Sequence, residues 1–173
     1  MRHLIFVAVF ALLVGCTAHY QVNSISGSSD KLKLDPKGEV YVTVSEDGLY
    51  EAKPAGGSGQ IVAQAVAKAF GKKTQNIHIE EKHESREAYL SEAQRVHAAY
   101  VVVPTISSWE QRATEWSGRP SRMMIRVTIL DARNGEQLAV TLIEGRSRIM
   151  SVTSTSPESL LQDPLDEYVS SLY

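Results

Sequence analysis

The run Ala99-Tyr100-Val101-Val102-Val103-Pro104-Thr105-Ile106 determines the architecture expected for this chain. Its uninterrupted apolar and β-branched residues are typical of a strand that is buried on both faces, so we place it at the centre of a sheet. Pro104 has no backbone N–H, which predicts that regular pairing ends or bulges at that residue. The remaining elements are therefore expected to surround this strand.

The segment before the central run predicts two strands and two helices. Val40, Val42 and Val44 alternate with polar or half-polar residues, which indicates a strand. Apolar residues then recur at helical spacing, and Ser58 and Ser85 stand where the N-caps of two helices are expected. The predicted order is a strand over 39–45, a helix over 60–70, a strand over 76–82 and a helix over 85–97.

The segment after the central run predicts a hairpin and a final helix. Residues 123–130 and 137–144 are apolar runs joined through Asn134-Gly135, a dipeptide that tolerates positive φ and favours a tight turn. Residues 156–172 carry an apolar helical face, in which Pro164 either kinks or restarts the helix.

These elements predict an α+β (mixed α/β) fold in the order β-α-β-α-β-β-β-α. Right-handed crossovers make the first strands parallel neighbours, and the last three strands form an antiparallel meander. We expect a five-stranded mixed sheet with helices packed mainly on one face, in a single globular domain over residues 39–173.

The N-terminus carries the features of a lipoprotein signal peptide over residues 1–15. Arg2 precedes a short apolar run that ends in Leu13, Val14, Gly15 and Cys16, the only cysteine of the chain. The run is too short to cross a membrane. It resembles the recognition site of bacterial lipoprotein signal peptidase, which implies a diacylglycerol and an acyl chain such as palmitate on Cys16. The alternatives are an ordinary signal peptide with a coincidental cysteine and an N-terminal core helix.

Thr17 follows the cysteine, where an aspartate would imply retention in the inner membrane. We therefore expect a lipid-anchored protein on the periplasmic face of the outer membrane. Residues 16–38 are predicted to form the lipidated cysteine and a flexible tether, because a polar, Gly/Ser-containing segment buries little apolar surface. Such a coil would span about 26 Å. A small extra strand at Leu32 and Leu34 is the alternative.

The charge and cysteine content of the chain limit the kinds of partner that we expect. The chain has 18 basic and 20 acidic residues without a long basic block, so we expect no nucleic-acid partner. A single cysteine allows no intrachain disulfide, so the domain must be stabilised by packing. Membrane lipid through acylated Cys16, an envelope protein and further copies of this chain are the partners expected.

Several segments together resemble a family of uncharacterised gram-negative lipoproteins. More distantly they are similar to the periplasmic domain of the curli-secretion lipoprotein and to the N-terminal domain of TolB. The resemblance covers about residues 39–173 and implies a fold, with no catalytic residues and no cofactor. The chain has no room for long amphipathic membrane hairpins, which argues against pore formation. The segments that carry the resemblance are Gly57-Ser58-Gly59, Ala98–Pro104, Trp109 and residues 127–136.

Two stretches approach catalytic or metal-binding motifs without completing them. Residues 56–60 resemble the G-x-S-x-G elbow of hydrolases around Ser58, but Gln60 replaces the last glycine, so helix capping is favoured. Residues 83–87 lack the second histidine of H-E-x-x-H. His78 and His83 have no third ligand in the sequence, and we predict no metal site.

The loop over residues 109–122 is the candidate partner-binding site, because Trp and Arg dominate binding hot spots. The alternative is that its tryptophans cover an end of the sheet. The candidate residues are Trp109, Arg112, Trp116, Arg119 and Arg122. We therefore predict a non-enzymatic binding, accessory or assembly module of the cell envelope. The alternatives are an envelope hydrolase that uses Ser58 and an oligomeric, secretion-pore-like subunit.

Overall fold

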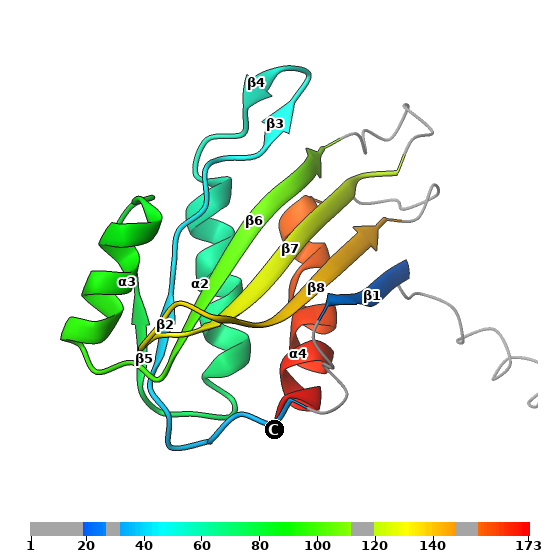
Figure 1. The fold of residues 1–173 in the computed structure, drawn as a ribbon. Helices are drawn as coiled ribbons and strands as arrows, with labels where there is room; N and C mark the ends of the chain where they lie inside the picture. Colours follow the sequence, from blue (N-terminus) through cyan, green and yellow to red (C-terminus); the bar gives the residue numbers. More distant parts are fainter. Residues whose placement is uncertain (1–18, 27–31, 112–119, 148–155) are drawn as a thin grey trace, which may run out of the picture.

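The computed structural model describes residues 19–26, 32–111, 120–147 and 156–173. Their elements are β1 (His19–Ser26), β2 (Val40–Val42), β3 (Leu49–Tyr50), β4 (Lys53–Pro54), α2 (Ser58–Phe70), β5 (Ile77–Ile79), α3 (Arg86–Arg95), β6 (Tyr100–Glu110), β7 (Arg122–Asp131), β8 (Gln137–Arg146), a 3-10 turn (Pro157–Leu160) and α4 (Gln162–Ser171). Six strands form the main sheet in the order β1-β8-β7-β6-β2-β5, and β3 and β4 form a small separate hairpin (Figure 1). The mixed α+β class is confirmed.

The central strand is β6, as its sequence predicts. It pairs in parallel with β2 on one side and antiparallel with β7 on the other. β2 also pairs in parallel with β5, while β6, β7 and β8 form the expected antiparallel meander. The topology of these five strands therefore follows the prediction.

Pro104 does not end β6, which continues to Glu110 with a bulge between Ile106 and Ser108. The reason lies in the direction of the backbone groups. Val102 O accepts a hydrogen bond from Thr43 N on the β2 side, and residues two apart direct their polar groups to the same side. The missing N–H of Pro104 would therefore point to the β2 side of β6. Because β2 ends at Val42, the proline removes no hydrogen bond of the sheet, and β6 can continue.

The helices cover the sheet unequally. α2 and α4 pack on one face, against a core that includes Val42, Val102 and Ile129, while α3 packs on the other face around Tyr41 and Val101 (Figure 1). The path from β2 to β5 crosses the sheet in the opposite direction to the path from β5 to β6. Right-handed crossovers in opposite directions place α2 and α3 on opposite faces.

The C-terminal segment packs as its apolar face predicts. Leu161, Leu165, Tyr168, Val169 and Leu172 are all buried at 2 % exposure or less. The helix restarts at residue 162 after the 3-10 turn, so its proline falls in the first turn of α4, where a missing N–H costs no helical hydrogen bond.

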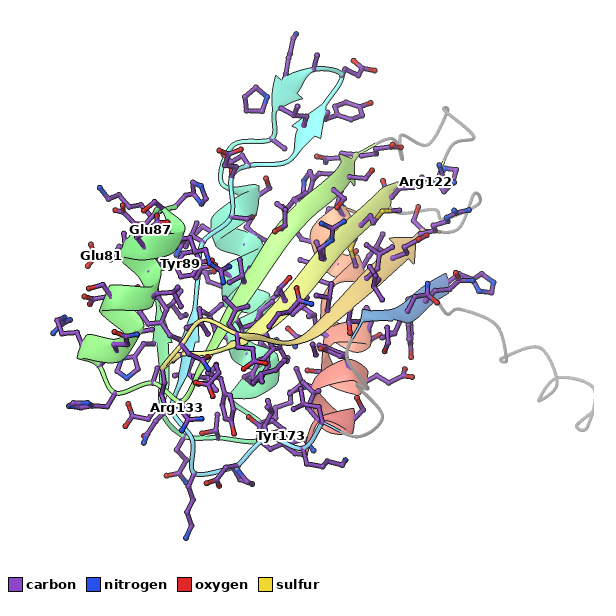
Figure 2. The ribbon with its side chains drawn as sticks, in the orientation of Figure 1. Glu81, Glu87, Tyr89, Arg122, Arg133 and Tyr173 are labelled. Atoms are coloured by element: carbon purple, nitrogen blue, oxygen red, sulfur yellow. The ribbon has the colours of Figure 1, made fainter. Side chains whose placement is uncertain are left out.

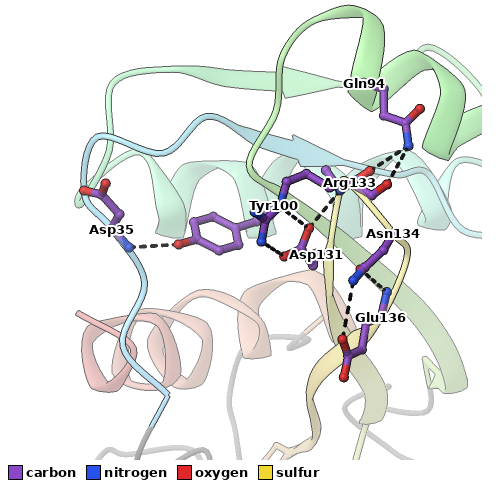
Figure 3. A network of polar contacts seen from close by, with 8 residues as sticks. Asp35, Gln94, Tyr100, Asp131, Arg133, Asn134 and Glu136 are labelled. Carbon is purple, nitrogen blue, oxygen red and sulfur yellow. Dashed lines mark hydrogen bonds and ion pairs between the residues drawn. The ribbon is translucent and has the colours of Figure 1, made fainter.

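The turn between β7 and β8 confirms the predicted hairpin, with one difference. Only Gly135 adopts a positive φ, of 71°, and Asn134 does not. Asn134 instead accepts a hydrogen bond from Glu136 N through its side chain, and Asp131 holds Arg133 in a tight ion pair (Figure 3). Side-chain bonds thus replace the second positive-φ residue.

The segment 19–26 corrects the expectation of a structureless tether and adds the sixth strand. β1 pairs antiparallel with β8 over the full length from His19 to Ser26. Its side chains bury little surface, and the stabilisation comes from backbone hydrogen bonds that also cover the edge of β8. Composition alone does not show this contribution. Tyr20 adds a 2.7 Å hydrogen bond to Glu167 on α4.

After β1, the next described residue is 32, and the chain packs against the core from there, seven residues before the predicted start of the domain. Leu34 is 4 % exposed and its N–H donates to Leu172 O at 2.8 Å. The alternative of a small extra strand at Leu32 and Leu34 is not found among the described residues. The two leucines instead pack against the main core.

Candidate functional site

The parallel part of the sheet has a topological switch point between β2 and β5. The chain leaves β2 toward α2 on one face and leaves β5 toward α3 on the other. In open α/β sheets, ligands bind outside the carboxyl ends of strands at such a point. The loops over residues 43–57 and 80–85 form this end of the sheet.

The start of α2 at this end is held by a side chain from the preceding loop. Ser58 is the first helical residue rather than the predicted N-cap, and Gly57 takes the cap position with φ of 81°. Asp47 accepts hydrogen bonds from Gly57 N and Gly59 N, both at 2.9 Å. The bond from Gly59 N is the main reason that the pKa of Asp47 lies below its usual range. A carboxylate therefore satisfies the free N–H groups of this helix.

Ser58 also helps to hold the start of α2. Its side chain is 1 % exposed, and its Oγ accepts a 2.9 Å hydrogen bond from Gly48 N. The hydroxyl lies 3.4 Å from Asp47 Oδ1. Among the hydrogen bonds of the described residues, none joins Ser58 to a histidine.

Glu80 and His83 connect the end of β5 to the end of β2. Glu80 is 5 % exposed, and its Oε2 accepts a 2.7 Å hydrogen bond from Val44 N. Burial raises the pKa of this carboxyl, and the bond from Val44 N opposes the rise. His83 Nδ1 lies 2.8 Å from Val44 O. The backbone of Val44 is thus bonded on both sides by residues of the β5–α3 loop.

A cleft of about 430 Å³ opens beside these residues. It lies between the extension of β2, the middle of β6 and the N-terminal half of α3, from which Tyr89 points toward the sheet (Figure 2). Ser45 lines the cleft, is 8 % exposed, and its Oγ has no hydrogen-bond partner in the described chain. Glu80 Oε1 is likewise buried and unpaired.

A second hollow, of about 560 Å³, lies at the opposite end of the sheet and has a structural explanation. Its polar groups are bonded to one another (Figure 3). Gln94 donates to Ala132 O at 3.0 Å, Asp131 is paired with Arg133, and Tyr100 OH accepts from Asp35 N at 3.1 Å. This end stabilises the hairpin turn, and none of the described side chains that line it has a buried polar atom without a partner.

The predicted partner-binding residues are only partly described. Trp109 lies within β6 and is 4 % exposed, so its indole belongs to the core on the α2 side of the sheet. Arg122 begins β7 and is partly exposed at the end of the sheet (Figure 2). Arg112, Trp116 and Arg119 lie outside the described residues.

The lipidation residue Cys16 and the recognition residues Leu13, Val14 and Gly15 also lie outside the described part. Within that part, no helix is long and apolar enough to span a bilayer. No group of three His, Cys, Asp or Glu side chains in the same ranges is placed to hold a metal ion. His78 pairs instead with Glu39 at 3.3 Å.

The fold and the cleft define a small mixed α/β domain whose distinctive polar groups gather at the end of its parallel strands. The chain belongs to the family described as domain of unknown function DUF4823, whose model matches residues 32–172. This match confirms the resemblance to an uncharacterised family, and its start agrees with the packed domain. No curated protein matches the chain.

The PelC structures share the fold of this chain at low sequence identity. The PelC dodecamer from Paraburkholderia phytofirmans has a TM-score of 0.64 and 16% identity, and the match covers 87% of this chain and 97% of that one. Lipoprotein GNA1162 from Neisseria meningitidis has a TM-score of 0.45 and 14% identity, with 69% of this chain and 86% of that one covered. The PelC match shows that most of this chain adopts a known fold.

Sequence reasoning missed the functional interest of Ser45 and Glu80. Ser45 follows directly on an alternating strand pattern, and Glu80 stands in a strand pattern at a position expected to be wet. The one available signal was topological, since two consecutive β-α units with reversed direction place both residues at a switch point.

Proposed function

We propose that this protein is a lipid-anchored accessory protein of the outer membrane, facing the periplasm and acting without catalysis. The observation that carries the proposal is the sequence Leu13-Val14-Gly15-Cys16 followed by Thr17. Several acyl chains on one cysteine hold a protein on a bilayer durably, since each buried CH₂ contributes about 0.8 kcal/mol.

The position of β1 adds a consequence of this anchor. Three peptide units separate Cys16 from His19, and a chain of that length spans at most about 11 Å. The end of the sheet where β1 begins, beside Arg122 and Arg146, is therefore held close to the lipid headgroups. The domain is anchored by its sheet edge and does not hang on a long tether.

The proposal is tested by separating inner and outer membranes from cells that express the full chain. Wild type is expected in the outer-membrane fraction. Cys16→Ser is expected to lose membrane association, and Thr17→Asp is expected to move the protein to the inner membrane. Recovery of Cys16→Ser in the outer-membrane fraction at wild-type levels would contradict the proposal.

We further propose that the protein assembles with copies of itself. The supporting observation is the match to the PelC dodecamer from Paraburkholderia phytofirmans. The face of the sheet opposite α4 adds to this: in the described residues no helix covers Met124 or Leu142, which are only partly buried. Native mass spectrometry of the detergent-extracted protein tests it, and a monomer at all concentrations would contradict it.

A catalytic role for Ser58 is the weaker candidate. The Ser58 hydroxyl already contacts Gly48 N and Asp47, and these contacts stabilise the start of α2. Ser58→Ala is expected to lower the stability and to leave any hydrolytic activity of the preparation unchanged, when activity is assayed with a chromogenic acyl ester. Loss of a measurable esterase activity in a folded Ser58→Ala variant would restore the hydrolase hypothesis.

A further inference from the structure

The cleft beside the ends of β2 and β5 has the position and size of a ligand site. It lies beyond the carboxyl end of β2, one of the two strands at the switch point, and ligands of α/β sheets bind outside such carboxyl ends. Its volume of about 430 Å³ lies within the range of small-ligand sites, roughly 300 to 1,000 Å³.

Ser45 gives independent evidence that the cleft is built to receive a polar group. The residue is 92 % buried, since 8 % remains exposed, and its hydroxyl has no partner among the described residues. A buried hydroxyl without a hydrogen bond destabilises the free protein. Alanine would fill the same place without that cost, so the hydroxyl is explained by a bond to a ligand.

The cleft is rich in acceptors, and its described lining contains no lysine or arginine. Glu46 and Asp47 contribute carboxylates. Val44 O can only accept a hydrogen bond, so His83 Nδ1 donates to it, and His83 Nε2 lies 3.8 Å from Glu46 Oε1. The adjacent Lys82 is paired with Glu84 at 3.2 Å and does not neutralise the cleft.

Most of the remaining lining is apolar, and Thr43 and Thr105 are the exceptions among the described residues. Leu49 on the β3–β4 hairpin is 62 % exposed at the rim, and Tyr89, Val103, Pro104 and Ile106 line the interior. A group that fits both parts has a donor-rich, positively charged head and an apolar stem. We propose that this cleft binds an ammonium or guanidinium group carried on an apolar stem. The head lies between Glu46, His83 and Ser45, and the stem lies on the apolar wall.

Two sources supply this chemistry: a free small amine, or a lysine or arginine side chain of a partner protein. The mature full-length protein in detergent is titrated by ¹⁵N NMR with pentylamine, pentylguanidine, and a capped Ala-Arg-Ala peptide. Pentanol and pentanoate are the uncharged and anionic controls. We expect the cations to shift the amide resonances of Ser45, His83 and Thr105, and the two controls to leave them unchanged.

Tighter binding of the peptide than of pentylguanidine would assign the site to a partner chain, and equal or weaker binding would assign it to a free cation. Both results support the site. It is overturned if no cation shifts these resonances at about 10 mM, the weak end of specific small-ligand binding. Equal shifts with pentanol or pentanoate would overturn it as well.

Matched variants separate a ligand site from a structural one. Glu46→Gln is expected to weaken binding of pentylguanidine about fivefold, the contribution of one exposed ion pair. Glu81→Gln, which removes the same charge outside the cleft lining, is the control and leaves binding unchanged. Ser45→Ala is expected to weaken binding while its Tm stays equal to or above that of wild type. A lowered Tm with unchanged binding would overturn the proposal.

Discussion

Asp47 offers a sharp test of how the start of α2 is held. The carboxylate lies outside the helix and accepts two 2.9 Å hydrogen bonds, from Gly57 N and Gly59 N. Removing a side chain that caps a helix costs about 0.5 to 2 kcal/mol. Asp47 is exposed to water but makes two charged bonds, so we expect Asp47→Ala to lose about 1.5 kcal/mol of unfolding free energy. That loss corresponds to about 5 °C in Tm.

The stabilisation contributed by the Asp47 carboxylate depends on pH in a defined direction. The pKa of Asp47 is lowered in the folded protein, mainly by the bond from Gly59 N. Its stabilisation is therefore fully present above the unfolded pKa of about 3.9 and is lost as the pH falls through the folded value. The stability difference between wild type and Asp47→Ala should stay constant from pH 7 to 5 and shrink below about pH 4.

Urea unfolding followed by circular dichroism measures both quantities. Glu46→Ala is the matched control, because it removes a neighbouring exposed carboxylate that makes no bond to α2. The account of the helix start is refuted if Asp47→Ala costs no more than the control. It is also refuted if the difference between Asp47→Ala and wild type is unchanged at pH 3.

Three further changes test the packing by urea unfolding. Gly59→Ala places a Cβ 2.1 Å from Ser45 O and should cost about 3 kcal/mol; a loss under about 1 kcal/mol would contradict this contact. Ala52→Gly relieves a positive φ of 61° in the β3–β4 turn and should gain up to about 1 kcal/mol, whereas a loss would argue against the left-handed turn. Glu80→Gln keeps an acceptor and removes a buried charge. Because burial raises the pKa of Glu80, its carboxyl favours the folded state below the unfolded pKa, and this contribution is lost as pH rises. Glu80→Gln should therefore gain about 1 kcal/mol at pH 7 and less at pH 4, and an equal gain at both values would contradict the burial of a charge.

The strands of the central sheet were predictable because their side chains carry the signal. The β-branched run at 99–106 and the alternating valines at 40–44 specify strands whatever surrounds them, and Asn134-Gly135 specifies the hairpin. β1 was not predictable in the same way. Its stability depends on an edge of β8 that exists only in the folded protein, and its polar side chains bury too little surface to show it.

The candidate site shows the same limit. Ser58 has the sequence of a helix cap, but the capping group comes from Asp47, eleven residues earlier along the chain. Trp109 is of a residue type that is frequent in binding hot spots, but β6 continues beyond Pro104 and places this side chain in the core. The unpaired hydroxyl of Ser45 depends on tertiary packing, which a single sequence does not reveal.

The central claim is that lipid on Cys16 holds a compact binding domain against the outer membrane. Its most direct measurement is the intact mass of the mature protein extracted from membranes. We expect a chain that begins at residue 16 and carries the added mass of a diacylglycerol and an acyl group. A chain cleaved elsewhere, an uncut leader, or an N-terminal cysteine without lipid would contradict the account.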